Sequence, residues 1–341
     1  MINHTYIHNN QFQLESGEIL PLLTINYCTY GKLNPEKNNV IWVCHALTAN
    51  ADVSAWWSGL VGEGKFYNPS EHFIVCANIL GSCYGTSGPL STNPVSHKPY
   101  YLNFPQTTIR DMVKAHEILR LHLGINKIHS CIGGSLGGQQ ALEWAITNPS
   151  LIEHLILLAT NAIHSPWGIA FNEAQRMAIK ADPTWMEESE TAGRNGLKAA
   201  RAVALLSYRN YFTYRNSQLE TDLEKIDNFK ASSYQNYQGE KLVNRFNCHS
   251  YIHLSKAMDS HNVGRGRTSV KNALKCIVAQ TLAIGITGDL LFPVDEQLFL
   301  KDHIDHASYS EIDSIYGHDG FLIETQKIQK SISNFYNHVK I

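Results

Sequence analysis

The glycine-rich segment from Gly133 to Gly138 is the part of the chain whose residue types most clearly suggest chemistry. It reads Gly133-Gly134-Ser135-Leu136-Gly137-Gly138 and so contains a Gly-x-Ser-x-Gly pentapeptide centred on Ser135. A serine that attacks a carbonyl group must project from a tight turn, and small flanking residues let the backbone bend that sharply. The alternative is a glycine-rich turn with an incidental serine. An apolar strand expected before the turn and a helix expected after it favour the nucleophile.

A nucleophilic serine needs a histidine base and an acid that orients this base. Asp289 directly follows an apolar run, and His318 lies in a glycine-flanked loop near the end of the chain. The order serine, acid, histidine is that of α/β-hydrolases, in which the two partners follow late strands. Asp295 and Asp313 are rival acids, but Asp295 falls at an expected helix start and Asp313 inside the last expected strand. We therefore predict that Asp289 is the acid.

Two backbone N–H groups are expected to stabilise the oxyanion that forms during acyl transfer. One belongs to Leu136, which follows Ser135 at the start of the expected helix. The other belongs to Leu47, in the loop His45-Ala46-Leu47-Thr48 after an early strand, where the second donor is found in this class of fold. For the side chain of His45 we favour a structural role within the loop.

Short apolar runs alternate with turns and with segments of helical period in the first half of the chain. The expected strands cover residues 39–44, 72–78, 128–132 and 154–160, and the expected helices cover residues 108–123 and 139–146. Almost continuously apolar strands that alternate with helices indicate a mostly parallel sheet covered on both faces. With the serine motif, this predicts an α/β-hydrolase fold.

The alternation breaks between residues 165 and 275, where helices joined by polar loops are expected. These helices cover residues 171–181, 196–214 and 251–258, whereas residues 216–239 have the weakest pattern. Two further strands are expected at residues 282–287 and 309–316, before a last helix from about Gly320. The insertion is too long for a plain loop. We therefore expect a catalytic core formed by residues 1–164 and 276–341, with residues 165–275 forming a helical lid.

Composition excludes several classes of protein. The 341 residues are 43% hydrophobic, and 28 Lys and Arg against 30 Asp and Glu give no basic footprint for nucleic acid or an anionic membrane. No apolar run reaches the roughly 18 residues of a membrane span, and the N-terminus does not resemble a signal peptide. The seven cysteines form no CxxC pair, which favours reduced thiols. We expect a cytoplasmic protein without a metal site, a bound cofactor, or a nucleic-acid or membrane partner.

Several motifs, in order along the chain, resemble those of homoserine O-acetyltransferases. They are His45-Ala46-Leu47-Thr48, Trp56-Trp57, Gly59-Leu60, Cys76 to Gly85, Gly133 to Gly138, Gln140 to Trp144, Ala200-Arg201, Ser207-Tyr208-Arg209, Gly264-Arg265-Gly266-Arg267, Asp289 to Pro293 and Gly317 to Leu322. The resemblance implies an α/β-hydrolase core with a helical lid, which transfers an acetyl group from the co-substrate acetyl-CoA to L-homoserine in methionine biosynthesis. It also implies a homodimer formed through lid helices.

The resemblance assigns roles residue by residue. It implies that the catalytic triad is Ser135, Asp289 and His318, and that the substrate is bound by Arg201, Tyr208 and Asp319. An Arg fork suits the α-carboxylate, Asp319 would receive the α-ammonium group, and Tyr208 can hydrogen-bond the substrate. Arg201 and Tyr208 are about two helical turns apart and so share one helix face. Arg265 and Arg267 either meet the phosphates of CoA or cap lid helices.

Some positions depart from the family pattern and leave alternatives open. The loop after Leu47 reads Thr48-Ala49-Asn50, where the family commonly has Gly-Asp, so a succinyl donor stays possible. L-Serine differs from homoserine by one methylene, which a pocket discriminates by only about 1–3 kcal/mol. Leu136 replaces a frequent methionine without removing the N–H donor. An esterase or thioesterase would use the same fold and triad. A non-catalytic binding protein is disfavoured by the intact triad.

Overall fold

The computed structural model describes residues 1–339; the last two residues of the expected core segment, 340 and 341, lie outside them. The strands are β1 (Ile2–His8), β2 (Phe12–Gln13), β3 (Ile19–Leu20), β4 (Leu23–Tyr30), β5 (Val40–Cys44), β6 (Phe73–Ala77), β7 (Ile128–Gly134), β8 (Ile152–Leu158), β9 (Gln280–Ile286) and β10 (Ala307–Ile312). The helices are α1 (Val53–Trp56), α2 (Ile109–His122), α3 (Leu136–Thr147), α4 (Pro166–Lys180), α5 (Arg194–Tyr208), α6 (Tyr211–Gln218), α7 (Lys230–Val243), α8 (Cys248–Asp259), α9 (Val270–Leu274), α10 (Val294–His303), α11 (Gly320–Ile323) and α12 (Thr325–Val339).

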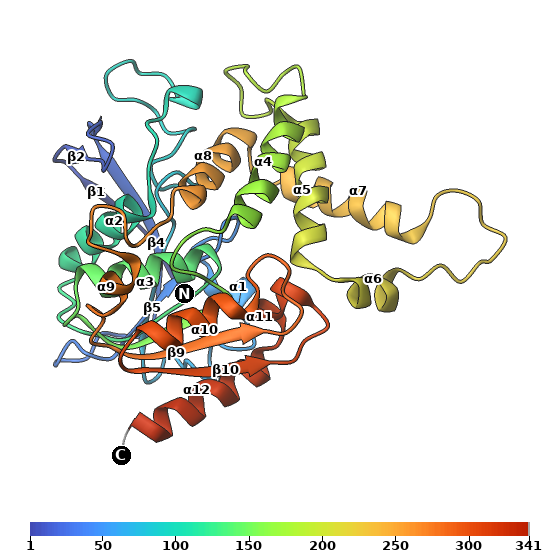
Figure 1. Ribbon diagram of the computed structural model, residues 1–341. Coiled ribbons are helices and arrows are strands. Elements are labelled where there is room, and N and C mark those ends of the chain that lie inside the picture. Colours follow the sequence, from blue (N-terminus) through green and yellow to red (C-terminus); the bar gives the residue numbers. More distant parts are fainter. Residues whose placement is uncertain (340–341) are drawn as a thin grey trace.

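Eight strands form one central sheet in the order β1-β4-β6-β5-β7-β8-β9-β10 (Figure 1). The five pairs from β6 to β10 are parallel, whereas β1 and β4 extend the sheet antiparallel. In a parallel sheet the carboxyl ends of neighbouring strands meet at one edge, so the loops after β5, β7 and β9 are brought together there. The expected mostly parallel α/β fold is confirmed.

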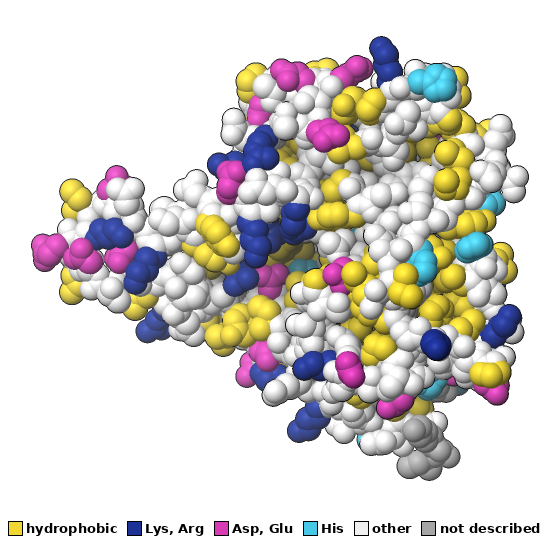
Figure 2. Space-filling view, turned by 180° about the vertical axis from the view of Figure 1, so that it is seen from behind, with side chains coloured by type: hydrophobic (Ala, Val, Ile, Leu, Met, Phe, Trp, Pro, Cys, Tyr) yellow, Lys and Arg dark blue, Asp and Glu magenta, His cyan; other side chains and the backbone are white. Residues whose placement is uncertain are grey.

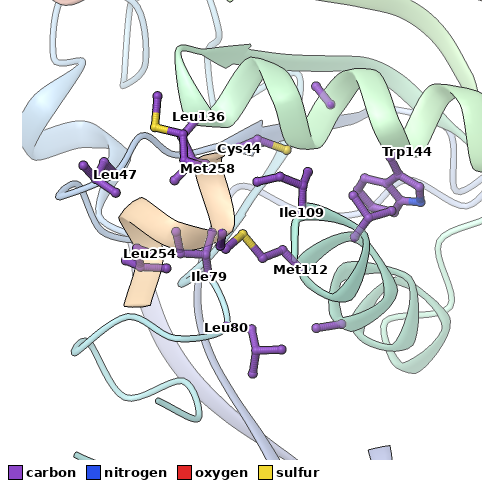
Figure 3. Packing of buried hydrophobic residues seen from close by; sticks show 14 of the residues in the cluster. Cys44, Leu47, Ile79, Leu80, Ile109, Met112, Leu136, Trp144, Leu254 and Met258 are labelled. Carbon is purple, nitrogen blue, oxygen red and sulfur yellow. The ribbon is translucent and has the colours of Figure 1, made fainter. Parts of the chain in front are cut away.

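Both faces of the sheet are buried, as the continuous apolar runs predict. In β5, Val40, Trp42 and Cys44 pack on the side of α2 and α3, and the rings of Trp42 and Trp144 meet edge-on at 4.9 Å. The alternate residues of β5 pack on the side of α1 and α12. Figure 3 shows Leu47 and Leu136 among these buried side chains, beside Leu254 and Met258 of α8. Helix α8 thereby packs on the core next to the loops that carry the site.

The elements between β8 and β9 are the helices α4 to α9, which occupy the segment expected to form the lid. Helices α6 and α7 and their connection project from the body (Figure 1). That this segment acts as a lid stays a prediction. Within the described residues, no helix combines the length and the apolar character that crossing a bilayer requires.

Two expectations for the helices and strands were wrong, and one helix was not predicted. The helix expected over residues 196–214 is broken after Tyr208, because the Asn210 side chain accepts a hydrogen bond from the backbone N–H of Thr213 and starts α6 there. The weakly patterned stretch 216–239 contains most of α7. The last strand ends at Ile312, so Asp313 lies in the loop after β10 and not inside the strand.

Candidate active site

Ser135 occupies a strained turn between β7 and α3. Its backbone angles are φ 56° and ψ −128°, in the region that favours glycine, and this holds the side chain at the carboxyl edge of the sheet. A Cβ atom on Gly137 would lie 2.1 Å from the carbonyl oxygen of Cys44. Glycine is therefore required for the start of α3 to approach the end of β5 this closely.

His318 and Asp289 are hydrogen-bonded, as the sequence predicts. His318 Nδ1 lies 2.7 Å from Asp289 Oδ2, and the side chains of both residues are buried. The other carboxylate oxygen of Asp289 accepts from the backbone N–H groups of Leu291 and Phe292, at 2.8 and 2.9 Å. The ring of Phe292 stacks on the imidazole at 5.1 Å. These contacts fix the orientation of the imidazole and direct its Nε2 atom away from Asp289.

The rival acids lie elsewhere. Asp295 is exposed in the first turn of α10, and Asp313 is exposed after β10. Glu296 is a further, half-buried carboxyl group in the first turn of α10. Burial raises its pKa to about 7; the negative charge of Asp289 adds to this rise, and a hydrogen bond from Asn161 opposes it. Glu296 therefore titrates near neutral pH beside the proposed triad.

The proposed oxyanion donors lie at the start of α3 and in the loop after β5. Leu136 is the first residue of α3, where a backbone N–H has no acceptor within the helix. The loop that carries Leu47 is fixed by His45, whose Nδ1 lies 2.9 Å from the Ala46 carbonyl oxygen and whose Nε2 accepts from the N–H of Ile79 at 3.0 Å. Burial lowers the pKa of His45 to about 4. His45 is thus a neutral residue that holds the loop, as expected.

A cavity of about 460 Å³ opens over Ser135. The residues that line it come from the loop after β5, from α1, from α5, from the end of α7 and the residues after it, and from the segment that carries His318. They are Ala46, Leu47, Thr48, Ala49, Asn50, Ala55, Trp56, Ser135, Arg201, Tyr208, Lys241, Arg245, His318, Asp319, Phe321 and Leu322. The cavity thus joins the candidate nucleophile and base to all three residues predicted to bind substrate.

Arg201 and Tyr208 lie on one face of α5, as their spacing predicts. The Arg201 guanidinium carbon lies 5.5 Å from the centre of the Tyr208 ring, and this ring lies 5.7 Å from that of His318. Within residues 1–339, Arg201 makes no ion pair with a carboxylate, which leaves its guanidinium available to an anion. Burial raises the pKa of Tyr208, and the positive charge of Arg201 partly offsets this. The Tyr208 hydroxyl therefore stays protonated at neutral pH.

Asp319 is paired with an arginine, Arg209, for which the sequence predicts no role. Its Oδ2 accepts a hydrogen bond from Arg209 Nε at 3.0 Å, and the guanidinium of Arg209 also lies 5.8 Å from the centre of the Tyr234 ring of α7. Any ammonium group that binds Asp319 therefore shares the carboxylate with Arg209. Arg209 is the last residue of the motif Ser207-Tyr208-Arg209, and its pairing with Asp319 becomes apparent only in the folded structure.

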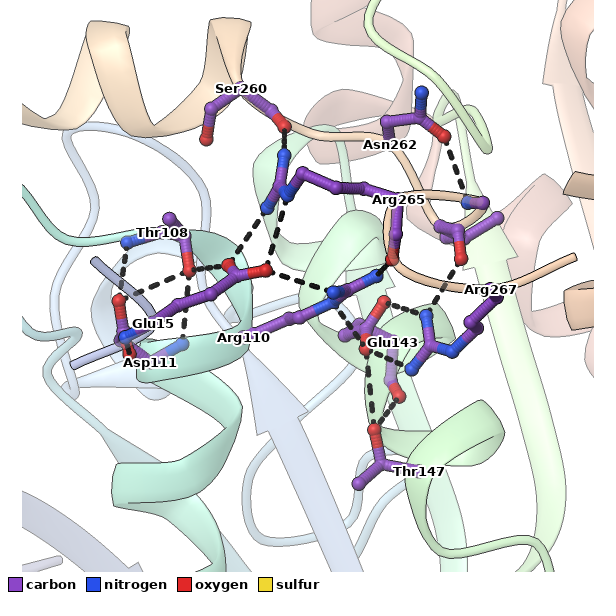
Figure 4. A network of polar contacts seen from close by, with 12 residues as sticks. Glu15, Thr108, Arg110, Asp111, Glu143, Thr147, Ser260, Asn262, Arg265 and Arg267 are labelled. Carbon is purple, nitrogen blue, oxygen red and sulfur yellow. Dashed lines mark hydrogen bonds and ion pairs between the residues drawn. The ribbon is translucent and has the colours of Figure 1, made fainter. Parts of the chain in front are cut away.

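Arg265 and Arg267 do not line the cavity. Figure 4 shows them in a network with Arg110, Glu15 and Glu143 that joins the loop after α8 to the core. Arg265 holds both oxygens of Glu15, at 2.8 and 3.1 Å. Arg267 holds both oxygens of Glu143, at 2.5 and 3.0 Å, and the Glu143 side chain is only 2% exposed. Both guanidinium groups pair with carboxylates away from the cavity, and Arg265 also donates to the carbonyl oxygen of Ser260 at the end of α8. The arrangement therefore favours the capping alternative, and the choice between the two roles stays a prediction.

Potential metal ligands gather away from this cavity. Within the described part of the chain, the group found is His129, Glu153 and His154, near the starts of β7 and β8 and thus at the far end of these strands from Ser135. That the protein works without a metal stays a prediction. All seven cysteines are free, and Cys276 is exposed whereas five others are buried.

Comparison with known proteins agrees with the fold. A family model described as the alpha/beta hydrolase fold matches residues 39–325. The homoserine O-acetyltransferase of Cyclobacterium marinum is 51% identical over 336 residues, which cover 98% of this chain and 95% of that protein. The crystal structure of homoserine O-acetyltransferase from Bacillus anthracis is 25% identical with a TM-score of 0.91, over 98% of this chain and 97% of that one. Esterase E22, which is 22% identical, shares the fold with a TM-score of 0.87, over 98% of this chain and all of the esterase chain (100%).

The strained serine between β7 and α3 and the Asp–His pair after later strands define a protein of the α/β-hydrolase fold. Within this fold, the chain is 51% and 44% identical to two homoserine O-acetyltransferases over nearly its whole length. The chain belongs to the homoserine O-acetyltransferase family.

Proposed function

We propose that this protein transfers an acetyl group from acetyl-CoA to the side-chain hydroxyl of L-homoserine, as a step of methionine biosynthesis. One observation carries the proposal: the cavity over Ser135 also contains Arg201, a cation without a carboxylate partner among the described residues, and Asp319. An α-amino acid is a zwitterion and needs one anionic and one cationic partner, whereas a simple ester needs neither. The family membership of the chain supports the same reaction.

The first half-reaction forms an acyl-enzyme. His318 takes the proton from Ser135 Oγ, which attacks the thioester carbonyl carbon. The backbone N–H groups of Leu47 and Leu136 stabilise the oxyanion. The carbon–sulfur bond then breaks, and CoA leaves as the thiol with the proton that His318 carried. Throughout this step, Asp289 keeps the imidazole in the required tautomer and stabilises its charged form.

The second half-reaction uses the same groups in the opposite direction. Arg201 binds the α-carboxylate of homoserine, Asp319 accepts the α-ammonium group and Tyr208 donates a hydrogen bond to the substrate. His318 removes the hydroxyl proton, the oxygen attacks the acetyl carbon, and Ser135 recovers its proton as the ester leaves. The lid segment, residues 165–275, limits access of water to the acyl-enzyme.

Release of thiol from acetyl-CoA and from succinyl-CoA, each with homoserine, with serine or without acceptor, tests the proposal. We expect fast release only with acetyl-CoA and homoserine together. A preference for succinyl-CoA would instead assign the Thr48-Ala49-Asn50 side of the cavity to a longer acyl group, and a preference for serine would change the acceptor. Fast release without acceptor would mean that water reacts with the acyl-enzyme, and the protein would then be a thioesterase.

The proposal includes a homodimer in the cytoplasm, joined through lid helices. Large apolar side chains are exposed on the projecting segment formed by α6, α7 and their connection: Tyr211, Phe212, Leu219, Leu223 and Ile226. A second subunit would cover such a surface. The mass in solution, measured by light scattering, tests this; a monomer at micromolar concentration would refute it.

A further inference from the structure

Two exposed cations, Lys241 and Arg245, lie at the mouth of the cavity. Lys241 is in the last turn of α7 and Arg245 follows the helix, so that the spacing of four residues places both on one side of it. Figure 2 shows Lys and Arg side chains gathered around a hollow between the projecting segment and the body. The nearby Glu240 does not neutralise them, because its carboxylate binds Arg194 at 2.7 Å and Lys198 at 2.8 Å.

The cavity therefore holds more positive charge than the proposed acceptor can use. Its charged lining consists of three cations and one carboxylate: Arg201, Lys241, Arg245 and Asp319. Homoserine is neutral overall, and it would occupy Arg201 with its carboxylate and Asp319 with its ammonium group. In the residues that the structure describes, neither Lys241 nor Arg245 forms an ion pair with a carboxylate. Two cations at the mouth thus remain for the other substrate.

Arg245 is held in place next to the loop that carries Leu47. Its Nη1 donates to the carbonyl oxygen of Thr48 and, at 2.6 Å, to the Tyr84 hydroxyl. Its Nη2 lies 3.4 Å from Thr48 Oγ1. A guanidinium group has five N–H donors, so two of them remain available to a bound anion. Lys241 makes no hydrogen bond through its side chain within residues 1–339 and acts as a mobile point charge beside this fork.

We infer that Lys241 and Arg245 bind the phosphate groups of the acyl donor. This inference rests on the proposed function. A CoA thioester places its acyl group and its phosphates at opposite ends of a long flexible arm. The thioester end must reach Ser135 inside the cavity, and the phosphates then lie outside, at the mouth where the two cations are exposed. Charge-assisted hydrogen bonds to phosphate suit both side chains.

The test compares two donors, acetyl-CoA and S-acetylpantetheine; the second carries the same thioester but lacks the phosphates and the adenosine of CoA. In Lys241→Gln we expect the KM for acetyl-CoA to rise about tenfold, the effect of losing one charge-assisted contact, with kcat unchanged. The same variant should use S-acetylpantetheine as well as the wild type does. The KM of the wild type for acetyl-CoA should also rise with ionic strength, more than that of the variant. Lys275→Gln, which removes an exposed lysine near the end of α9, is the matched control.

Two results would overturn the inference. An equal loss with both donors would mean that Lys241 only supports the lid, and no loss with either would mean that it does not meet the donor. Calorimetric binding of CoA to Ser135→Ala, with and without Lys241→Gln, separates this inference from the proposed function. If CoA binds and its affinity falls about tenfold in the double variant, the phosphate site stands even where transfer to homoserine is not observed.

Discussion

Replacement of Glu296 by glutamine should change how the stability of the protein depends on pH. Burial raises the pKa of Glu296 from 4.5 to about 7 in the folded protein. Between these values the unfolded chain loses the proton while the folded protein keeps it. The folded state then binds more protons, so the free energy of unfolding falls as the pH rises from 4.5 to about 7. Above that range both states are ionised and the loss is complete.

The size of this effect follows from the pKa values. A rise from 4.5 to about 7 corresponds to about 3 kcal/mol, at about 1.4 kcal/mol per pKa unit, as an upper value. Glutamine keeps the shape of the side chain but does not titrate. We therefore expect Glu296→Gln to be as stable as the wild type near pH 4.5 and about 1–3 kcal/mol more stable at pH 8.5.

Urea denaturation followed by tryptophan fluorescence, at a series of pH values from 4.5 to 8.5, measures this difference. Glu63→Gln is the control, because Glu63 is exposed and its replacement should leave the pH dependence as in the wild type. If Glu296→Gln loses stability between pH 4.5 and 7 as steeply as the wild type, Glu296 is not the group responsible and the reasoning from its burial fails.

Three further substitutions test the site and its support. Ser135→Ala should abolish thiol release driven by homoserine, and half of the activity remaining would exclude Ser135 as the nucleophile. Arg201→Met should raise the KM for homoserine about 10–100-fold, through the loss of a bidentate contact with the α-carboxylate. It should leave the rate of enzyme acetylation unchanged in a stopped-flow assay; an unaltered homoserine KM would refute the role of Arg201. Glu143→Ala should lower the free energy of unfolding by about 3–5 kcal/mol, because it leaves Arg110 and Arg267 without their shared carboxylate. A denaturation midpoint within error of the wild type would contradict this.

The sequence predicts the parallel part of the sheet well and its antiparallel edge poorly. Strands such as β5, which is buried along its whole length, are continuous apolar runs that stand out in the sequence. Strand β1 is partly exposed at the sheet edge, and polar residues are interspersed among its apolar ones. Strand β4 likewise contains Thr24, Asn26 and Thr29, so neither strand is a continuous apolar run. Helix α7 is equally difficult to predict from the sequence, because it is mostly polar. It packs closely against α5 at Gly239, where a Cβ atom would lie 3.1 Å from the Lys198 carbonyl oxygen.

The candidate triad could be located because its residues follow strands whose carboxyl ends share one edge of the sheet. The partners of three arginines, Arg209, Arg265 and Arg267, could not be predicted from the sequence. Arg265 and Arg267 stand in a glycine-rich segment that suits phosphate as well as carboxylate. Their partners, Glu15 and Glu143, are 250 and 124 residues away in sequence. Arg209 and Asp319 are 110 residues apart, so the sequence does not predict their pairing either.

Transfer to an amino acid rather than to water must be decided by what the lid segment adds, because a triad on this core activates a hydroxyl and a water molecule alike. The segment adds positive charge: Arg201, Arg209, Lys241 and Arg245 all lie on or beside α5 and α7, whereas the core contributes the single carboxylate Asp319 to the cavity. Neither water nor a neutral ester gains from these charges. A zwitterionic acceptor and a phosphate-bearing donor would both be bound more tightly by these charges, and each would contact a different subset of the cations. On this proposal, the choice of reaction depends on where α5 and α7 place three cations in the cavity over a serine whose own chemistry is shared with hydrolases.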